Sequence, residues 1–289
     1  MPYSENTIKA YNRALRKLGE EGFNDLSRDP EGVVEYLHIK YDKMNTRKQY
    51  LSAIMSTFED KKDIPQVYKD AILAEFDLQK MKEKNQELTP EQDKNYLPWK
   101  EIMKVQKLLA KMEDKNRPQW LAYLVVSLYT LTSPVRSDYG TMKVDSKKRK
   151  TGNCFVNRKS RPYFVFRDYK TKDAYGDVEV PVPKPLMRVI EGWFEHLGYV
   201  PEFLLDKEYN NIVLSNYVRD VFHRYSGKAV GINLLRHAYI TEYLPKLKSI
   251  KKKEALARKM MHSKERQELY NLPDKEGSGD GPNTHQSQE

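Results

Sequence analysis

A helical segment near the C-terminus, residues 232–244, restricts what this chain can fold into more than any other feature. Its apolar residues recur with the period of one helix face, and Pro245 ends the helix because a proline ring disfavours helical backbone just before it. Asn233, Arg236 and His237 stand at i, i+3 and i+4 and therefore share one face. An amide, a guanidinium and an imidazole together offer donors suited to a tetrahedral anion. The segment predicts an anion-binding helix.

Length and charge fit a two-domain protein with a polyanionic partner. The chain has 289 residues, enough for two domains, and 39% of them are hydrophobic. Its 51 Lys and Arg exceed its 41 Asp and Glu, and nucleic acid is the usual partner of a chain with a net charge of +10. No apolar run approaches the ~18 residues of a membrane span, and no signal-peptide core is present. With a single cysteine, Cys154, the chain has neither a disulfide framework nor a cysteine-based zinc site. We expect an intracellular protein, in the cytoplasm or nucleus of a host cell.

The first 84 residues have the pattern of a compact helical domain. Asp29 and Pro30 form a helix cap followed by proline at the first helical position. Two further helices are expected, one from Asn45 or Thr46 and one from near Pro65 to residue 84. A generic helical bundle would have the same spacing of apolar residues.

The rest of the chain predicts a linker, a second domain at 98–273 and a tail. Residues 85–97 are polar and lack apolar periodicity, which indicates the linker. The apolar run 120–131 predicts a central buried helix, and residues 154–156, 163–166 and 178–182 have the composition of short strands. A hairpin turn is expected at 167–176, and the polar residues 274–289 predict a disordered tail. The expected fold is mainly α with a small antiparallel β-sheet.

Further motifs surround the helix at 232–244 in a fixed order. Arg136 follows the buried run through a short turn, and a lysine, Lys172, lies in the expected hairpin turn. His262 comes after the helix, and Tyr270 follows it by about two helical turns. Phosphate-binding donors, a histidine and a late tyrosine indicate attack on a phosphodiester by a phenolic oxygen.

This order resembles the tyrosine recombinase (phage-type integrase) family, whose signature runs Arg, Lys, His-x-x-Arg, His or Trp, and then Tyr. The resemblance covers nearly the whole chain except the tail. Residues 4–11 resemble the opening of the family's core-binding domain, and residues 46–54 resemble its third helix. It therefore implies an N-terminal core-binding domain followed by a catalytic domain.

The resemblance implies a catalytic set drawn from distant parts of the chain. Tyr270 would be the nucleophile that forms a 3′-phosphotyrosine link, while Arg136 and Arg236 would hold the non-bridging phosphate oxygens. Lys172 would protonate the departing 5′-hydroxyl, and His262 would donate a hydrogen bond to the phosphate. Such chemistry uses no metal or cofactor. It also needs no ATP, because the covalent link conserves the energy of the phosphodiester.

The partner implied by the resemblance is double-stranded DNA, bound by a homotetramer on paired sites. Lys48, Lys170 and His237 would contact DNA, and Lys170 is also the second choice for the catalytic lysine. The basic stretch 246–253 would either lie on DNA or serve as a solvated connector. An integrase of a virus or another mobile element is the setting that fits this reading.

Asn233 departs from the family signature, which has a histidine at this position. An amide donates and accepts hydrogen bonds but does not transfer protons as an imidazole does. Asn233 would still hold a phosphate oxygen or orient Arg236. Two alternatives stay open: a type IB topoisomerase-like enzyme that only relaxes supercoils, and a DNA-binding relative that has lost catalysis.

Overall fold

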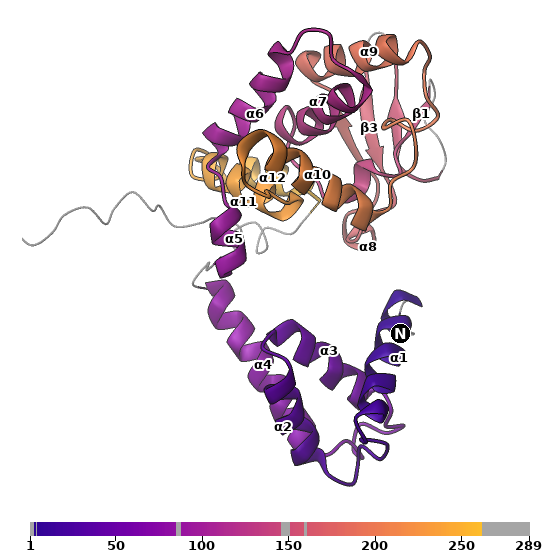
Figure 1. Ribbon diagram of the computed structural model, residues 1–289, viewed down its shortest axis with the longest axis vertical. Coiled ribbons are helices and arrows are strands. Elements are labelled where there is room, and N and C mark those ends of the chain that lie inside the picture. The colour runs from indigo at the N-terminus through magenta and orange to yellow at the C-terminus, as the bar shows by residue number, and fades with distance from the viewer. Residues whose placement is uncertain (1–2, 4, 85–87, 146–150, 159–160, 262–289) are drawn as a thin grey trace, which may run out of the picture. The chain divides into compact units, whose positions relative to one another are not determined.

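A computed structural model describes residues 3, 5–84, 88–145, 151–158 and 161–261 (Figure 1). The chain divides into two compact units, Met1–Asn85 and Gln86–Glu289, which are described separately. No helix in the described ranges combines the length and the apolar character that crossing a membrane requires.

The described part of the first unit consists of helices α1 (Glu5–Glu20), α2 (Pro30–Lys40), α3 (Met44–Met55) and α4 (Gln66–Lys84). Helix α3 packs against both α1 and α4. The predicted cap of α2 is present, since the Asp29 carboxylate accepts a hydrogen bond from the Gly32 amide at 2.9 Å. Helix α3 begins one or two residues before the predicted start. The apolar stripes of these helices meet in one core: Leu18, Val33, Leu37, Tyr50, Leu51, Ile54 and Tyr68.

A buried ion pair joins α3 to α4. Arg47 meets the Glu75 carboxylate in a bidentate arrangement, with Nε on one oxygen and Nη2 on the other at 3.0 Å. Arg47 Nη1 also donates to the Tyr41 carbonyl at 2.8 Å, which fixes the connection between α2 and α3. Glu75 is 1% exposed and Arg47 11%, so each charge depends on the other for compensation.

The second unit packs helices around a small sheet. Its longer helices are α6 (Trp99–Lys111), α7 (Arg117–Thr130), α9 (Lys184–Leu197), α10 (Asn211–Ser226), α11 (Ile232–Tyr243) and α12 (Ile250–Lys259). The predicted apolar run forms α7, which packs against α6 and α9 (Figure 1). Its N-terminus has a capping box formed by Asn116 and Gln119. The core contains residues from the sheet and from α7 and α11, including Tyr129, Phe164, Phe166 and Leu235.

The sheet has strand order β1 (Lys143–Asp145), β2 (Cys154–Val156), β3 (Tyr163–Phe166) and β4 (Val178–Pro181). The pairs β2–β3 and β3–β4 are antiparallel, as predicted. Strand β1 was not predicted and pairs parallel with β2, so the sheet is mixed rather than antiparallel. A three-residue strand with charged residues at both ends has no apolar run by which the sequence could show it. The expected class, mainly α with a small sheet, is confirmed.

Two segments differ from the expected connections. The predicted linker contains helix α5 (Pro90–Asn95), which starts at a capping box between Thr89 and Gln92. A six-residue helix is too short to show apolar periodicity. The predicted hairpin turn between β3 and β4 is a longer connection that includes the short helix α8 (Lys172–Tyr175). Both differences bear on the candidate site.

We predict that Glu75→Gln destabilises the first unit by roughly 3 kcal/mol, because it leaves the Arg47 charge buried without compensation. Trp99, Trp120 and Trp193 all lie in the second unit, so tryptophan fluorescence reports on that unit alone. In a urea titration of Glu75→Gln, the part of the far-UV circular dichroism signal that comes from the first unit should be lost at a lower urea concentration than in the wild type. The tryptophan fluorescence transition should occur at the same urea concentration as in the wild type.

Glu5→Gln is the matched control for this substitution. Glu5 pairs with Lys9 at 2.6 Å on the exposed surface of α1, where an ion pair contributes little. Its circular dichroism transition should coincide with that of the wild type. Equal transitions for Glu75→Gln and Glu5→Gln would show that the buried pair does not stabilise the first unit.

Candidate active site

Arg136 is held by the chain that leads out of α7. Loop 131–136 connects α7 to the short 3-10 helix η1 (Ser137–Tyr139), and Arg136 is the residue just before that helix. The Tyr129 hydroxyl donates to the Arg136 carbonyl at 2.8 Å. The hydroxyl of Ser133, in the same loop, forms a hydrogen bond of 3.2 Å with the hydroxyl of Tyr239 on α11. The loop is thus fastened to two helices, and the Arg136 side chain is half-buried.

Arg236 lies inside the protein rather than on an open helix face. Its side chain is completely buried on α11, and Nη1 donates to the carbonyls of Pro134 at 3.1 Å and Met260 at 3.2 Å. Asn233, which shares its helix face, is exposed, and His237 is half-buried. The buried guanidinium therefore links the loop before Arg136 to the end of α12.

The two arginines converge on neighbouring carbonyls. Arg136 Nη1 donates to the Met261 carbonyl at 3.1 Å, next to the Met260 carbonyl that Arg236 contacts. Met261 has φ +53°, in the left-handed region that non-glycine residues seldom adopt. This conformation lies at the turn that ends α12. The structure therefore brings together guanidinium groups that lie 100 residues apart in the sequence.

The connection between β3 and β4 reaches the same point. The Thr171 hydroxyl donates to the Met261 carbonyl at 2.8 Å, so Thr171 and Arg136 share one acceptor. Lys172, the next residue, opens α8, and both Lys172 and Lys170 have exposed side chains. The connection between β3 and β4 thus places both candidate lysines next to Thr171, which contacts the arginine cluster. The connection is longer than the hairpin turn expected from the sequence.

Asn153, which the sequence did not single out, positions this connection. It is buried, and its carbonyl oxygen accepts from the amides of Arg167 at 2.9 Å and Asp168 at 3.0 Å. Its amide nitrogen donates to the Asp138 carbonyl at 3.2 Å, in η1. Asn153 thereby ties the segment that follows Arg136 to the start of the segment that carries Lys172. An isolated asparagine in a polar stretch gives no sequence signal for such a role.

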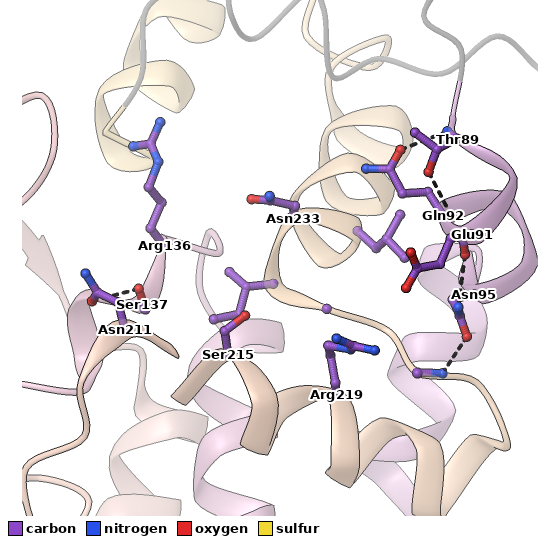
Figure 2. A pocket seen from close by; sticks show the side chains of 14 residues that line it. Thr89, Glu91, Gln92, Asn95, Arg136, Ser137, Asn211, Ser215, Arg219 and Asn233 are labelled. Carbon is purple, nitrogen blue, oxygen red and sulfur yellow. Dashed lines mark hydrogen bonds between the residues drawn. The ribbon is translucent and has the colours of Figure 1, made fainter. Parts of the chain in front are cut away.

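A hollow of about 470 Å³ opens beside the arginine cluster (Figure 2). The Asn233 side chain lies in it together with Arg136. Within the described ranges, the side chains of Asn233 and of Ser215 on α10 make no hydrogen bond. Residues of α5, including Gln92 and Asn95, form the opposite wall. The segment predicted to be a linker is therefore part of this pocket.

The other sequence candidates lie elsewhere or outside the described residues. Lys48, in the first unit, donates to the Gln79 side chain, and its ammonium lies 5.1 Å from the centre of the Phe76 ring. These contacts place Lys48 against α4. His262 and Tyr270 fall outside the described residues, as does the tail at 274–289.

Asp138 adds a carboxylate close to both arginines. Burial raises the pKa of the Asp138 carboxyl to about 6, although the charges of Arg136 and Arg236 lower it. Its Oδ2 is buried and accepts no hydrogen bond from the residues that the structure describes. The two guanidinium groups favour binding of a phosphate-like anion, whereas the Asp138 carboxyl, once ionised, opposes it.

Comparisons with known proteins agree with the fold. No family model matches the sequence, and no curated protein matches it. A solved structure of the XerH site-specific recombinase, a post-cleavage complex with palindromic difH, matches with a TM-score of 0.57 at 15% identity over 92% of this chain and 75% of that chain. The XerH pre-cleavage complex with difH has a TM-score of 0.49 at 14% identity, over 91% of this chain and 76% of that chain. The structure of XerA recombinase has a TM-score of 0.46 at 15% identity, over 94% of this chain and 89% of that chain. At 15% identity the likeness to the post-cleavage XerH complex shows the fold alone, which is a tyrosine recombinase fold.

We predict that Asp138 makes the second unit less stable as the pH rises from about 4 to about 6. In this pH range the Asp138 carboxyl keeps its proton in the folded state, whereas the same carboxyl in the unfolded chain, with a pKa of 3.8, has already released it. The stability contributed by the protonated carboxyl is fully present below pH 3.8 and is lost as the pH rises to the folded pKa, by an amount on the order of 3 kcal/mol. Asp138→Asn should abolish this fall, as measured by urea unfolding followed by tryptophan fluorescence at several pH values.

The control is Asp173→Asn, because Asp173 is an exposed carboxylate on α8. This variant should retain the wild-type decline in stability between pH 4 and 6. If Asp138→Asn retains the same decline, the buried carboxyl is not its source.

Proposed function

We propose that this chain, which has the fold of tyrosine recombinases, is a site-specific DNA recombinase or integrase. It would cleave and rejoin DNA through a 3′-phosphotyrosine intermediate without a metal or ATP. The observation that carries the proposal is the convergence of Arg136 and Arg236 on the adjacent carbonyls of Met260 and Met261. Two guanidinium groups at one point suit the two non-bridging oxygens of a phosphodiester.

The carbonyls now bound by the arginines indicate how a phosphate would enter. A phosphate oxygen carries more negative charge than a carbonyl oxygen, so its hydrogen bonds with a guanidinium are stronger. DNA would replace the hydrogen bonds to Met260 and Met261 and thereby move the turn that precedes His262. The arginines would then stabilise the charge that develops on the phosphorus during the reaction.

The remaining catalytic roles are proposed from the motif order. Tyr270 would attack the phosphorus, His262 would donate a hydrogen bond to the phosphate, and Lys172 would protonate the leaving 5′-hydroxyl. Lys172 and Lys170 flank Thr171, which contacts the arginine cluster, and both side chains are exposed, so Lys170 stays the second choice for this role. The 5′-hydroxyl of another strand would reverse the attack, and a homotetramer on paired DNA sites would exchange the strands.

A second candidate function is DNA binding without cleavage. It is favoured by Asn233, whose amide lines the pocket beside Arg136 where the family signature has a histidine. A topoisomerase-like activity would share the cleavage step but would not exchange strands. Transfer of a label between two duplexes distinguishes recombination from relaxation alone.

We predict that Tyr270→Phe abolishes covalent attachment to DNA while the affinity for DNA stays within about twofold of wild type, because only the nucleophilic oxygen is removed. A selection from random-sequence duplexes supplies a bound sequence. Substrates carrying a nick at successive positions in it then trap the adduct, which denaturing gel electrophoresis detects.

Tyr243→Phe is the control, since Tyr243 is 38% exposed on α11 and lies outside the proposed nucleophile segment. It should form adducts at the wild-type rate. Persistent adducts in Tyr270→Phe would refute the assignment of the nucleophile. Wild-type protein that binds the selected DNA but forms no adduct would favour the non-cleaving alternative.

We also predict that Asn233→His raises the rate of adduct formation by tenfold or more, because an imidazole next to the phosphate can transfer a proton. The increase should depend on pH with the titration of a histidine. Single-turnover cleavage of the nicked substrate measures both effects, with Asn233→Ala as the variant that offers neither a proton nor a hydrogen bond. Equal rates in the histidine and alanine variants would exclude a proton-transfer role at this position.

A further inference from the structure

The pocket beside the arginine cluster contains a third guanidinium, that of Arg219. Arg219 lies on α10, its side chain is exposed, and it lines the same hollow as Arg136 and Asn233 (Figure 2). Its side chain makes no hydrogen bond or ion pair with any residue in the described ranges. Ser215, one helical turn earlier, faces the same hollow and also has no partner there. These donors are available to an external ligand.

The position of Arg219 is supported by the backbone next to it. A side-chain carbon at Gly231 would lie 3.5 Å from Cγ of Arg219, so the aliphatic part of the arginine passes close over this glycine. This is an ordinary van der Waals distance, so the aliphatic part of Arg219 packs beside the start of α11, which carries Asn233 and Arg236.

Helix α5 closes the other side of the pocket. The Asn95 side chain accepts a hydrogen bond from the Ala229 amide at 2.9 Å, and Lys228 donates to the Tyr96 carbonyl at 3.2 Å. These bonds fasten α5 to the connection between α10 and α11. Glu91 on α5 adds a carboxylate to this wall. Its charge repels a phosphate, so an anionic chain would follow the wall that contains Arg136, Asn233 and Arg219.

We propose that Arg219, together with Ser215, binds a second phosphate of the DNA strand whose reactive phosphate lies at Arg136 and Arg236. This inference rests on the proposed function. A hollow of about 470 Å³ is larger than a single phosphate group needs, and its unused donors lie on one wall. A DNA strand carries one phosphate per nucleotide, so a strand held at one phosphate presents the next one nearby. The second contact fixes the direction of the strand through the site.

The test is the salt dependence of duplex DNA binding by the full chain. Each phosphate contact contributes about 0.9 to the slope of log K against log salt concentration. Arg219→Gln removes the charge but keeps the aliphatic part over Gly231, so it should weaken binding about tenfold and make the slope shallower by about 0.9. Arg219→Lys should restore the wild-type slope, because a lysine also neutralises one phosphate. Fluorescence anisotropy with a labelled duplex measures both quantities.

Arg224→Gln is the matched control, with the same charge change on the same helix. Arg224 is exposed in the last turn of α10 and does not line the pocket. The salt-dependence slope of Arg224→Gln should equal that of the wild type. Arg136→Gln, which removes a proposed phosphate contact, should make the slope shallower, as Arg219→Gln does. If Arg219→Gln and Arg224→Gln have the same slope, the second phosphate contact is refuted and the proposed function stays intact. A wild-type protein that binds no duplex DNA would instead refute the proposed function itself.

Discussion

The rest of the candidate site depends on the hydrogen bonds that the buried guanidinium of Arg236 donates to two backbone carbonyls. This guanidinium holds the Pro134 carbonyl on one side and the Met260 carbonyl on the other, so it joins the loop before Arg136 to the end of α12. A charge that is completely buried is costly unless hydrogen bonds compensate it. The side chain proposed to bind phosphate therefore also sets the spacing of the segments around it.

Two uncharged residues complete this framework. Asn153 binds backbone groups of η1 and of the segment after β3, and Thr171 binds the Met261 carbonyl that Arg136 also contacts. Neither residue would take part in chemistry. Their hydrogen bonds are directional, so they position Lys172 relative to the arginines more strictly than apolar packing alone would do.

The pocket shows that the site extends beyond the arginine pair. Helix α5 belongs to its wall, although the segment around it looks like a linker in the sequence. With Arg219 on the opposite wall, the hollow has a cationic side and a side that carries Glu91. This asymmetry is a property of the second unit alone, and it gives an anionic strand a preferred path.

The sequence by itself determined the elements whose evidence is local. Helical periodicity predicted α11, a continuous apolar run predicted α7, and β-forming runs predicted β2, β3 and β4, because these patterns depend on near neighbours in the chain. Strand β1 and helix α5 were too short to leave such a pattern. The resemblance implied that Arg136 and Arg236 act on one phosphate. Their contacts with adjacent carbonyls, the role of Asn153 and the position of Arg219 in the pocket were decided only by the tertiary structure. Periodicity fixes which residues share a face of one element, but packing of the whole core fixes which faces meet.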